Sequence, residues 1–83
     1  MENDAMHRTR DTLKRQYGQA YTYIEQALIV LGDLNKKFSE QHPEYCPLFE
    51  SVGMSLLMAE SGIEDIVRLT FGYVPANFSD WRQ

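Results

Sequence analysis

A basic cluster near the start of the chain is the first group of residues whose chemistry suggests a ligand. One acid, Asp11, accompanies four bases: Arg8, Arg10, Lys14 and Arg15. Backbone N–H groups and the helix dipole favour anions at the start of a helix, so this cluster could bind a phosphate, another anion or a partner protein. We favour instead pairing of these bases with acids from the other end of the chain, because the whole chain is acidic. The acids expected to reach this region are Glu64, Asp65 and Asp80.

Three glutamates form a second candidate site. Glu60 and Glu64 are one helical turn apart, and Glu25 would lie near the level of Glu60 in an antiparallel hairpin. Carboxylates in such positions bind Mg²⁺ in helical nucleotide hydrolases or a di-iron centre in ferritin-like bundles. The chain has neither the Glu-x-x-His motif nor the paired acidic motifs of those sites. We therefore interpret the glutamates as a solvated acidic face and predict no metal, no cofactor and no catalytic residue.

Four potential metal ligands alternate through the stretch SEQHPEYCP: Glu40, His42, Glu44 and Cys46. One histidine and one cysteine in a loop are a weak zinc pattern, because structural zinc sites combine several such ligands at fixed spacing. We expect His42 to cap or pack at a turn, and Cys46 to behave as a small apolar residue.

Composition narrows the protein class. The chain has 83 residues, a formal net charge of −4 and a pI of about 5.0, which makes general nucleic-acid binding unlikely. Cys46 is the only cysteine and the first residues are too polar for a secretion signal, so we expect a cytoplasmic protein. The longest apolar run, residues 27–31, is far too short to cross a membrane.

Two long segments carry apolar residues at alternating intervals of three and four, the period of packed helices. The first segment covers about residues 5–39 and the second about residues 44–71. Neither alternates with the period of two that strands require. The sequence therefore predicts an all-α protein, a long antiparallel helical hairpin that forms a single domain over residues 1–83.

The ends of the second helix and the tail can also be predicted. Pro43 and Pro47 are each compatible with the first turn of a helix, and Gly72 can adopt the left-handed conformation that ends one. Residues 72–83 have no helical period but include Phe78 and Trp81. Because a solvated tail rarely contains two large aromatic residues so close together, we expect this irregular tail to dock on the hairpin.

The first helix is apolar around more than half of its circumference, which is more than one antiparallel neighbour can cover. One chain supplies only one long partner helix, so we predict a homodimer in which two hairpins form a four-helix bundle. The predicted centre of that interface contains Tyr17, Tyr21, Ile24, Leu28 and Leu31.

A second apolar set lies off the main stripe of the second helix and consists of Met54, Leu57 and Met58. Methionine-rich surfaces adapt to different partners, so this face is a candidate contact with another protein. The alternative is that the three residues belong to the core of the bundle, and we favour that alternative.

Our leading hypothesis is a non-enzymatic interaction protein, an adaptor, inhibitor or regulator, that acts as a homodimer and binds another protein. A second hypothesis is a nucleotide or small-ligand binder that stacks the ligand on tyrosines and holds its phosphates with the basic cluster. Those tyrosines would be Tyr17, Tyr21 and Tyr23. A third, less favoured hypothesis is a nucleic-acid-binding module, whose affinity would fall steeply with salt.

Overall fold

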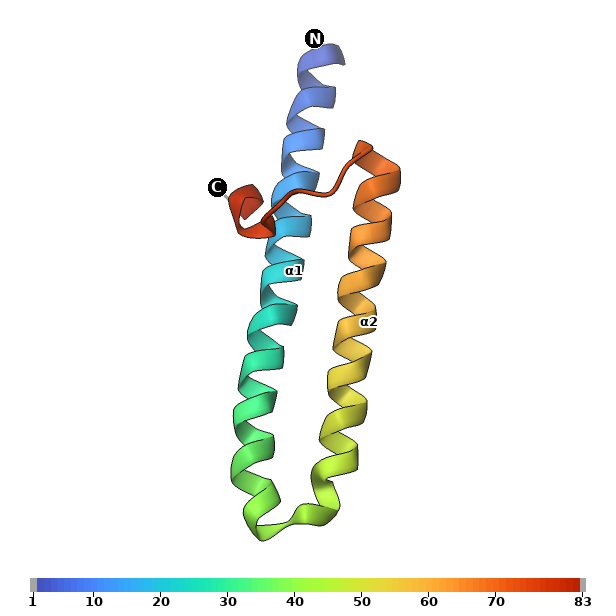
Figure 1. Ribbon diagram of the computed structural model, residues 1–83. Helices are drawn as coiled ribbons and strands as arrows, with labels where there is room; N and C mark the ends of the chain where they lie inside the picture. The colour runs from blue at the N-terminus through green and yellow to red at the C-terminus, as the bar shows by residue number, and fades with distance from the viewer. Residues whose placement is uncertain (1, 83) are drawn as a thin grey trace.

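The chain folds into two long helices and a short C-terminal helix, as seen in a computed structural model (Figure 1). The structure describes the backbone of residues 2–82 and the side chains of residues 10–81. Helix α1 covers Glu2–Gln41, the 3₁₀ helix η1 covers Pro43–Tyr45, helix α2 covers Cys46–Phe71 and the 3₁₀ helix η2 covers Phe78–Arg82. No strand occurs within residues 2–82. The predicted all-α antiparallel hairpin is confirmed.

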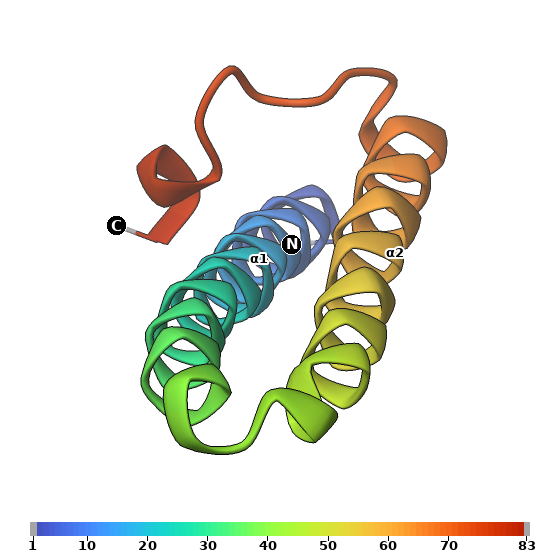
Figure 2. The ribbon, with the colours of Figure 1, turned by 60° about the horizontal axis from the view of Figure 1, so that its bottom comes forward.

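The turn between the helices follows from its prolines. Helix α1 continues two residues beyond the predicted end, and the His42 N–H then donates a hydrogen bond to the Phe38 carbonyl oxygen at 2.6 Å. Pro43 opens the 3₁₀ turn, and Pro47 lies in the first turn of α2, where its missing N–H does not matter. Figure 2 shows the two long helices running side by side from this turn.

The end of α2 matches the prediction. Gly72 has a φ of 85°, in the left-handed region, and its N–H donates to the Arg68 carbonyl oxygen at 2.8 Å. A glycine adopts this conformation without the steric cost that a Cβ would add. The chain therefore leaves the helix here and crosses back towards α1 (Figure 2).

The C-terminal tail (residues 72–82) docks on α1, as predicted, and it ends in a 3₁₀ helix rather than remaining irregular. Gly18 is the buried contact point on α1, because a Cβ at this position would lie 2.8 Å from the Phe78 carbonyl oxygen and 2.9 Å from the Trp81 Cβ. Phe78 is 5% exposed and packs with Trp81, whose ring centroid is 5.6 Å away. The tail therefore contributes to the core.

The core lies at the tail end of the hairpin. Among the side chains of residues 10–81, the buried apolar ones are Val67, Phe71 and Phe78, all beyond the middle of α2. The molecule measures 60 × 22 × 19 Å, and its radius of gyration of 16.8 Å exceeds the roughly 12 Å of a compact 83-residue domain. The half of the hairpin near the turn is therefore two helices thick and has no third layer.

Candidate interaction surfaces

One whole side of the hairpin has no charged residue among the described side chains. An α-helix advances 100° per residue, so residues three, four and seven apart share a face. Ala27 lies half a turn around α1 from Gly18 and therefore points away from the docked tail. We call the surface around it the uncharged face. Its members are Ala20, Tyr23, Ala27, Leu31, Leu34 and Phe38 on α1, and Leu48, Val52, Ser55, Ala59, Ile63 and Ile66 on α2.

Large apolar side chains on this face remain open to solvent. On α1, Tyr23 is 58% exposed and Phe38 is 44% exposed; on α2, Leu48 is 63% exposed and Val52 and Ile66 are each 47% exposed. Near the turn the two helices enclose an apolar groove of about 360 Å³. The groove is lined by Leu31, Phe38, Tyr45, Leu48, Phe49 and Val52. A continuous apolar surface of this kind is typical of a protein interface.

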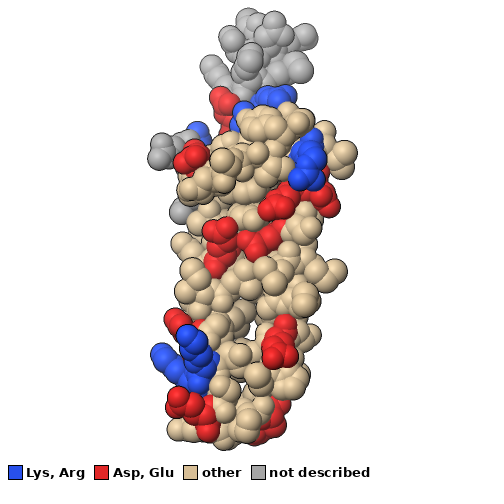
Figure 3. Space-filling model, in the orientation of Figure 1, with Lys and Arg blue, Asp and Glu red and all other residues tan. Residues whose placement is uncertain are grey.

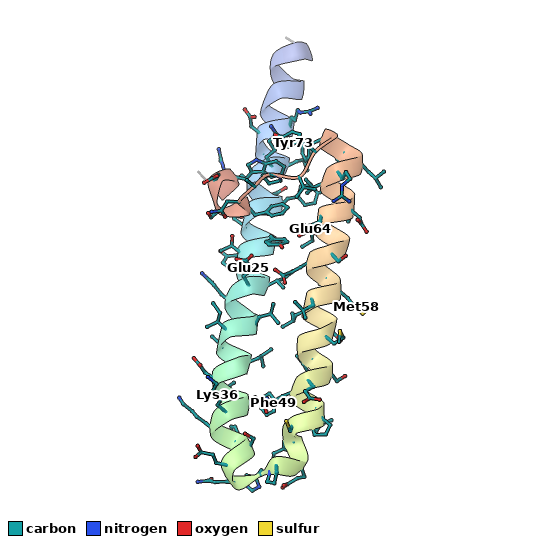
Figure 4. All side chains as sticks on the ribbon, in the orientation of Figure 1. Glu25, Lys36, Phe49, Met58, Glu64 and Tyr73 are labelled. Atoms are coloured by element: carbon teal, nitrogen blue, oxygen red, sulfur yellow. The ribbon has the colours of Figure 1, made fainter. Side chains whose placement is uncertain are left out.

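The side that carries the tail is different, because charged residues gather on it (Figure 3). Acidic side chains cross the middle of this side, below the tail (Figure 3). Glu25 from α1 and Glu64 from α2 lie at this level (Figure 4). The hairpin therefore has one charged side, which holds the tail, and one uncharged side.

A polar cluster lies between the helices beneath the tail. The Tyr21 hydroxyl donates a hydrogen bond to Glu64 Oε1 at 2.9 Å, and Glu60 is only 9% exposed. Burial raises the pKa of Glu60, and the nearby charge of Glu25 raises it further, whereas the Tyr21 hydroxyl acts in the opposite direction. Burial and the hydrogen bond to Glu64 also raise the pKa of Tyr21. The interpretation of these glutamates as a solvated face is therefore wrong for Glu60, while Glu25 is exposed.

The described part of the chain holds no group of three His, Cys, Asp or Glu side chains arranged to hold a metal ion. At the turn, His42 Nδ1 lies 3.2 Å from Glu44 Oε1, and the Cys46 thiol donates to Glu50 Oε1 at 3.7 Å. His42 and Glu44 thus contact each other, whereas Cys46 is engaged with Glu50 one turn along α2.

The predicted basic cluster contacts aromatic rings. Lys14 Nζ lies 5.6 Å from the centroids of Phe71 and Tyr73 and 5.5 Å from that of Trp81, and Arg10 Cζ lies 5.0 Å from the Phe71 centroid. These are cation–π distances.

The acids expected to pair with the basic cluster have other contacts. Asp65 accepts a hydrogen bond from Arg68 at 3.1 Å, and Glu64 accepts one from Tyr21. Asp80 shares a hollow of about 270 Å³ with Asp11, Lys14, Arg15 and Trp81. Arg8 lies outside the described side chains.

The residues predicted for the centre of a dimer interface divide into three groups. Tyr17 contacts Phe71 edge to face and Tyr21 stacks on Phe78, so both pack against the chain's own core. Ile24 and Leu28 are partly buried. Leu31 is the one member that lines the apolar groove of the uncharged face.

The methionine face of α2 is open to solvent. Met54, Leu57 and Met58 are 61%, 52% and 69% exposed, so they are not part of the core of a single hairpin. Met58 points away from α1 (Figure 4), and Leu69, further along the outer side of α2, is 87% exposed. These residues form a second apolar surface, separate from the uncharged face.

Comparisons with protein-family models, curated proteins and solved structures find no match for this chain. Within the described residues, no helix has both the length and the apolarity needed to cross a bilayer. The geometry of the surfaces is therefore the basis for any functional proposal.

Sequence reasoning did not identify the uncharged face or the buried position of Glu60. A usable signal for the face was present, because charged residues are missing from one third of the circumference of α1 over residues 10–41 and of α2. Burial of Glu60 depends on how Tyr21, Glu25 and Glu64 surround it between the two helices, and the sequence pattern does not specify that packing.

Proposed function

We propose that this chain is a non-enzymatic interaction protein that assembles as a homodimer through its uncharged face and presents the methionine face to another protein. On this proposal it is intracellular, where its partly buried single thiol stays reduced. Its role would be that of an adaptor, inhibitor or regulator.

The uncovered uncharged face is the observation that carries this proposal. A compact monomer of 9.7 kDa would expose about 5,100 Å² of surface. The chain exposes 6330 Å², an excess of about 1,200 Å². A standard protein interface covers about 800 Å² on each partner, so the excess over the whole elongated chain is of the size that dimerisation could bury.

The methionine face supports the second half of the proposal. Met54, Leu57 and Met58 lie mostly on the outer side of α2 and would remain accessible if two uncharged faces paired. Flexible thioether side chains can fit differently shaped partners, which suits an adaptor or regulator.

Nucleotide binding receives less support. Two of the three tyrosines expected to stack on a ligand already contact rings of the core: Tyr17 meets Phe71 edge to face, and Tyr21 stacks on Phe78. Lys14 and Arg10, expected to hold phosphates, lie over aromatic rings of the core.

A pair of charge substitutions tests the proposed dimer. Val52→Glu places a carboxylate in the apolar groove, and we expect it to produce monomers by sedimentation at concentrations where the unchanged chain is dimeric. Ser51→Glu places the same charge on the exposed outer side of α2 and should leave the mass unchanged. If the two variants have the same mass in solution, the uncharged face is not the dimer interface.

A further inference from the structure

The uncharged face has a groove at one end and projecting side chains at the other. The groove near the turn lies between Phe38 of α1 and Leu48 and Val52 of α2. Nearer the tail end, Tyr23 and Ile66 are large, 58% and 47% exposed, and belong to the same face. The face is therefore hollowed near the turn and carries large exposed side chains at its other end.

The register of the helices shows how these features are spaced. The ring contact between Phe38 and Phe49 and the hydrogen bond between Tyr21 and Glu64 fix which residues lie level with one another. By this register, the centres of the two halves of the uncharged face lie side by side. The centre of the α1 half is level with position 57 of α2, which is also the centre of the α2 half. The groove and the projecting residues lie at similar distances on either side of this level.

A symmetric dimer can pair two uncharged faces in two ways, with the turns of the two copies at the same end or at opposite ends. If the turns of both copies lie at the same end, each groove of about 360 Å³ faces the other groove and both stay unfilled. Unfilled apolar volume loses packing contacts and is unfavourable. If the turns lie at opposite ends, Tyr23 and Ile66 of each copy meet the groove of the other.

Small residues occupy the middle of the uncharged face, where a second copy could approach closely. Ala27, Ser55 and Ala59 occupy the middle of the uncharged face, between the groove and the projecting residues. Small side chains at a helix crossing allow the backbones to approach, so the larger side chains on both sides can interlock.

We propose that the partner on the uncharged face is a second copy of this chain with its turn at the opposite end, and that Ile66 and Tyr23 of each copy fill the groove of the other. This inference rests on the proposed function, because it specifies the orientation of the proposed homodimer. Each groove is then completed by residues that the other copy supplies.

The native Cys46 gives a direct test, because it is the only cysteine and lies at the turn end of α2. With a nitroxide spin label on Cys46, pulsed electron resonance measures the distance between the two labels of a dimer. Opposite turns place the labels about 35 Å apart, given a rise of 1.5 Å per residue and helix separations of 8–10 Å. Turns at the same end place them level with each other on diagonally opposed helices, about 11–14 Å apart.

The outcomes separate the inference from the proposed function. A main distance near 35 Å in a dimer supports the inference, whereas a distance below about 15 Å, or a mixture of both, overturns it and leaves the homodimer intact. A chain that stays monomeric, with no coupling between labels, overturns both. If labelling of Cys46 disturbs the fold, Glu40→Cys in a Cys46→Ser chain carries the same expectations from an exposed position.

The groove itself provides a second readout. Ile66→Ala removes one of the filling side chains, and we expect at least a tenfold weaker dimer by sedimentation. Leu69→Ala removes a similar side chain from a position that is 87% exposed on the outer side of α2, and it should leave the dimer unchanged. Equal dissociation constants for the two variants would contradict the proposed packing.

Discussion

The ring of Tyr21 stacks on the ring of Phe78, with centroids 4.1 Å apart and an angle of 16° between the planes. Tyr21 lies in the middle of α1, whereas Phe78 belongs to the C-terminal tail, so this contact joins distant parts of the chain. It also places the tail directly over the hydrogen bond from Tyr21 to Glu64. The tail is therefore the third layer of the hairpin at this level.

Phe78→Ala tests the contribution of this layer. Because Phe78 is 5% exposed and packs on Tyr21 and Trp81, we expect its removal to lower the free energy of unfolding by about 3–5 kcal/mol. The fluorescence of Trp81, the only tryptophan, should shift to longer wavelength as the tail detaches. Leu69→Ala, at an exposed position, should change stability by less than about 0.5 kcal/mol and leave the emission unchanged.

Gly18→Ala sets two opposing effects on stability against each other: the gain in helix propensity and the loss of space for the docked tail. Alanine favours a helix by about 1 kcal/mol over glycine, but its Cβ at this position would lie 2.8 Å from the Phe78 carbonyl oxygen. We expect a net loss of about 1–3 kcal/mol in chemical denaturation, together with a shift in Trp81 emission.

Gly32→Ala is the matched control on the same helix, because a Cβ there would meet nothing within 4 Å. This substitution should raise the free energy of unfolding by about 1 kcal/mol. Gains of similar size at both glycines would show that the tail does not press on Gly18.

Glu60 should make stability depend on pH above the usual titration range of a glutamate side chain. Its pKa is raised in the folded chain above the ordinary value of about 4.3, so the folded state binds more protons in this range. Its contribution to the free energy of unfolding therefore falls as pH rises. We expect Glu60→Gln to be more stable than the parent at pH 7, with the difference shrinking towards pH 5.

The neighbours of Glu60 define the control for this pH series. Glu25, Glu64 and Tyr21 face Glu60 and belong to the same electrostatic cluster, so they are unsuitable. Glu40→Gln removes the same carboxylate from an exposed position near the turn, so it controls for the loss of one charge at each pH. A pH-independent effect of Glu60→Gln would contradict the buried position of this carboxyl group.

The methionine face can be tested with a photo-crosslinking amino acid. Placed at position 58, which is 69% exposed on the outer side of α2, it should form a discrete protein adduct in the native cell. Placed at the exposed position 33 on α1, it should not form that adduct. Adducts of equal yield at both positions, or none at position 58, would argue against a partner on this face.

Much of the fold was predictable because it depends on local chemistry. The apolar period specified two helices, Pro43 and Pro47 specified the turn, and Gly72 specified the end of α2. Each of these features acts over a few residues, so the sequence pattern is enough to find it.

The position of the tail was not predictable in the same way, because it depends on a match between distant residues. Docking requires the space at Gly18 and the ring of Tyr21 to meet Phe78 and Trp81, and a helical period does not encode that match. The prediction that Tyr17 and Tyr21 lie at the centre of a dimer interface remains untested, although the tail and α2 already cover much of both side chains.

The mass of the unchanged chain in solution tests the central claim most directly. Sedimentation equilibrium over a range of concentrations should give twice the 9.7 kDa of the chain, with dissociation only on dilution. A constant mass of 9.7 kDa up to the highest concentration would mean that the uncharged face stays in water, and it would contradict the proposed dimer.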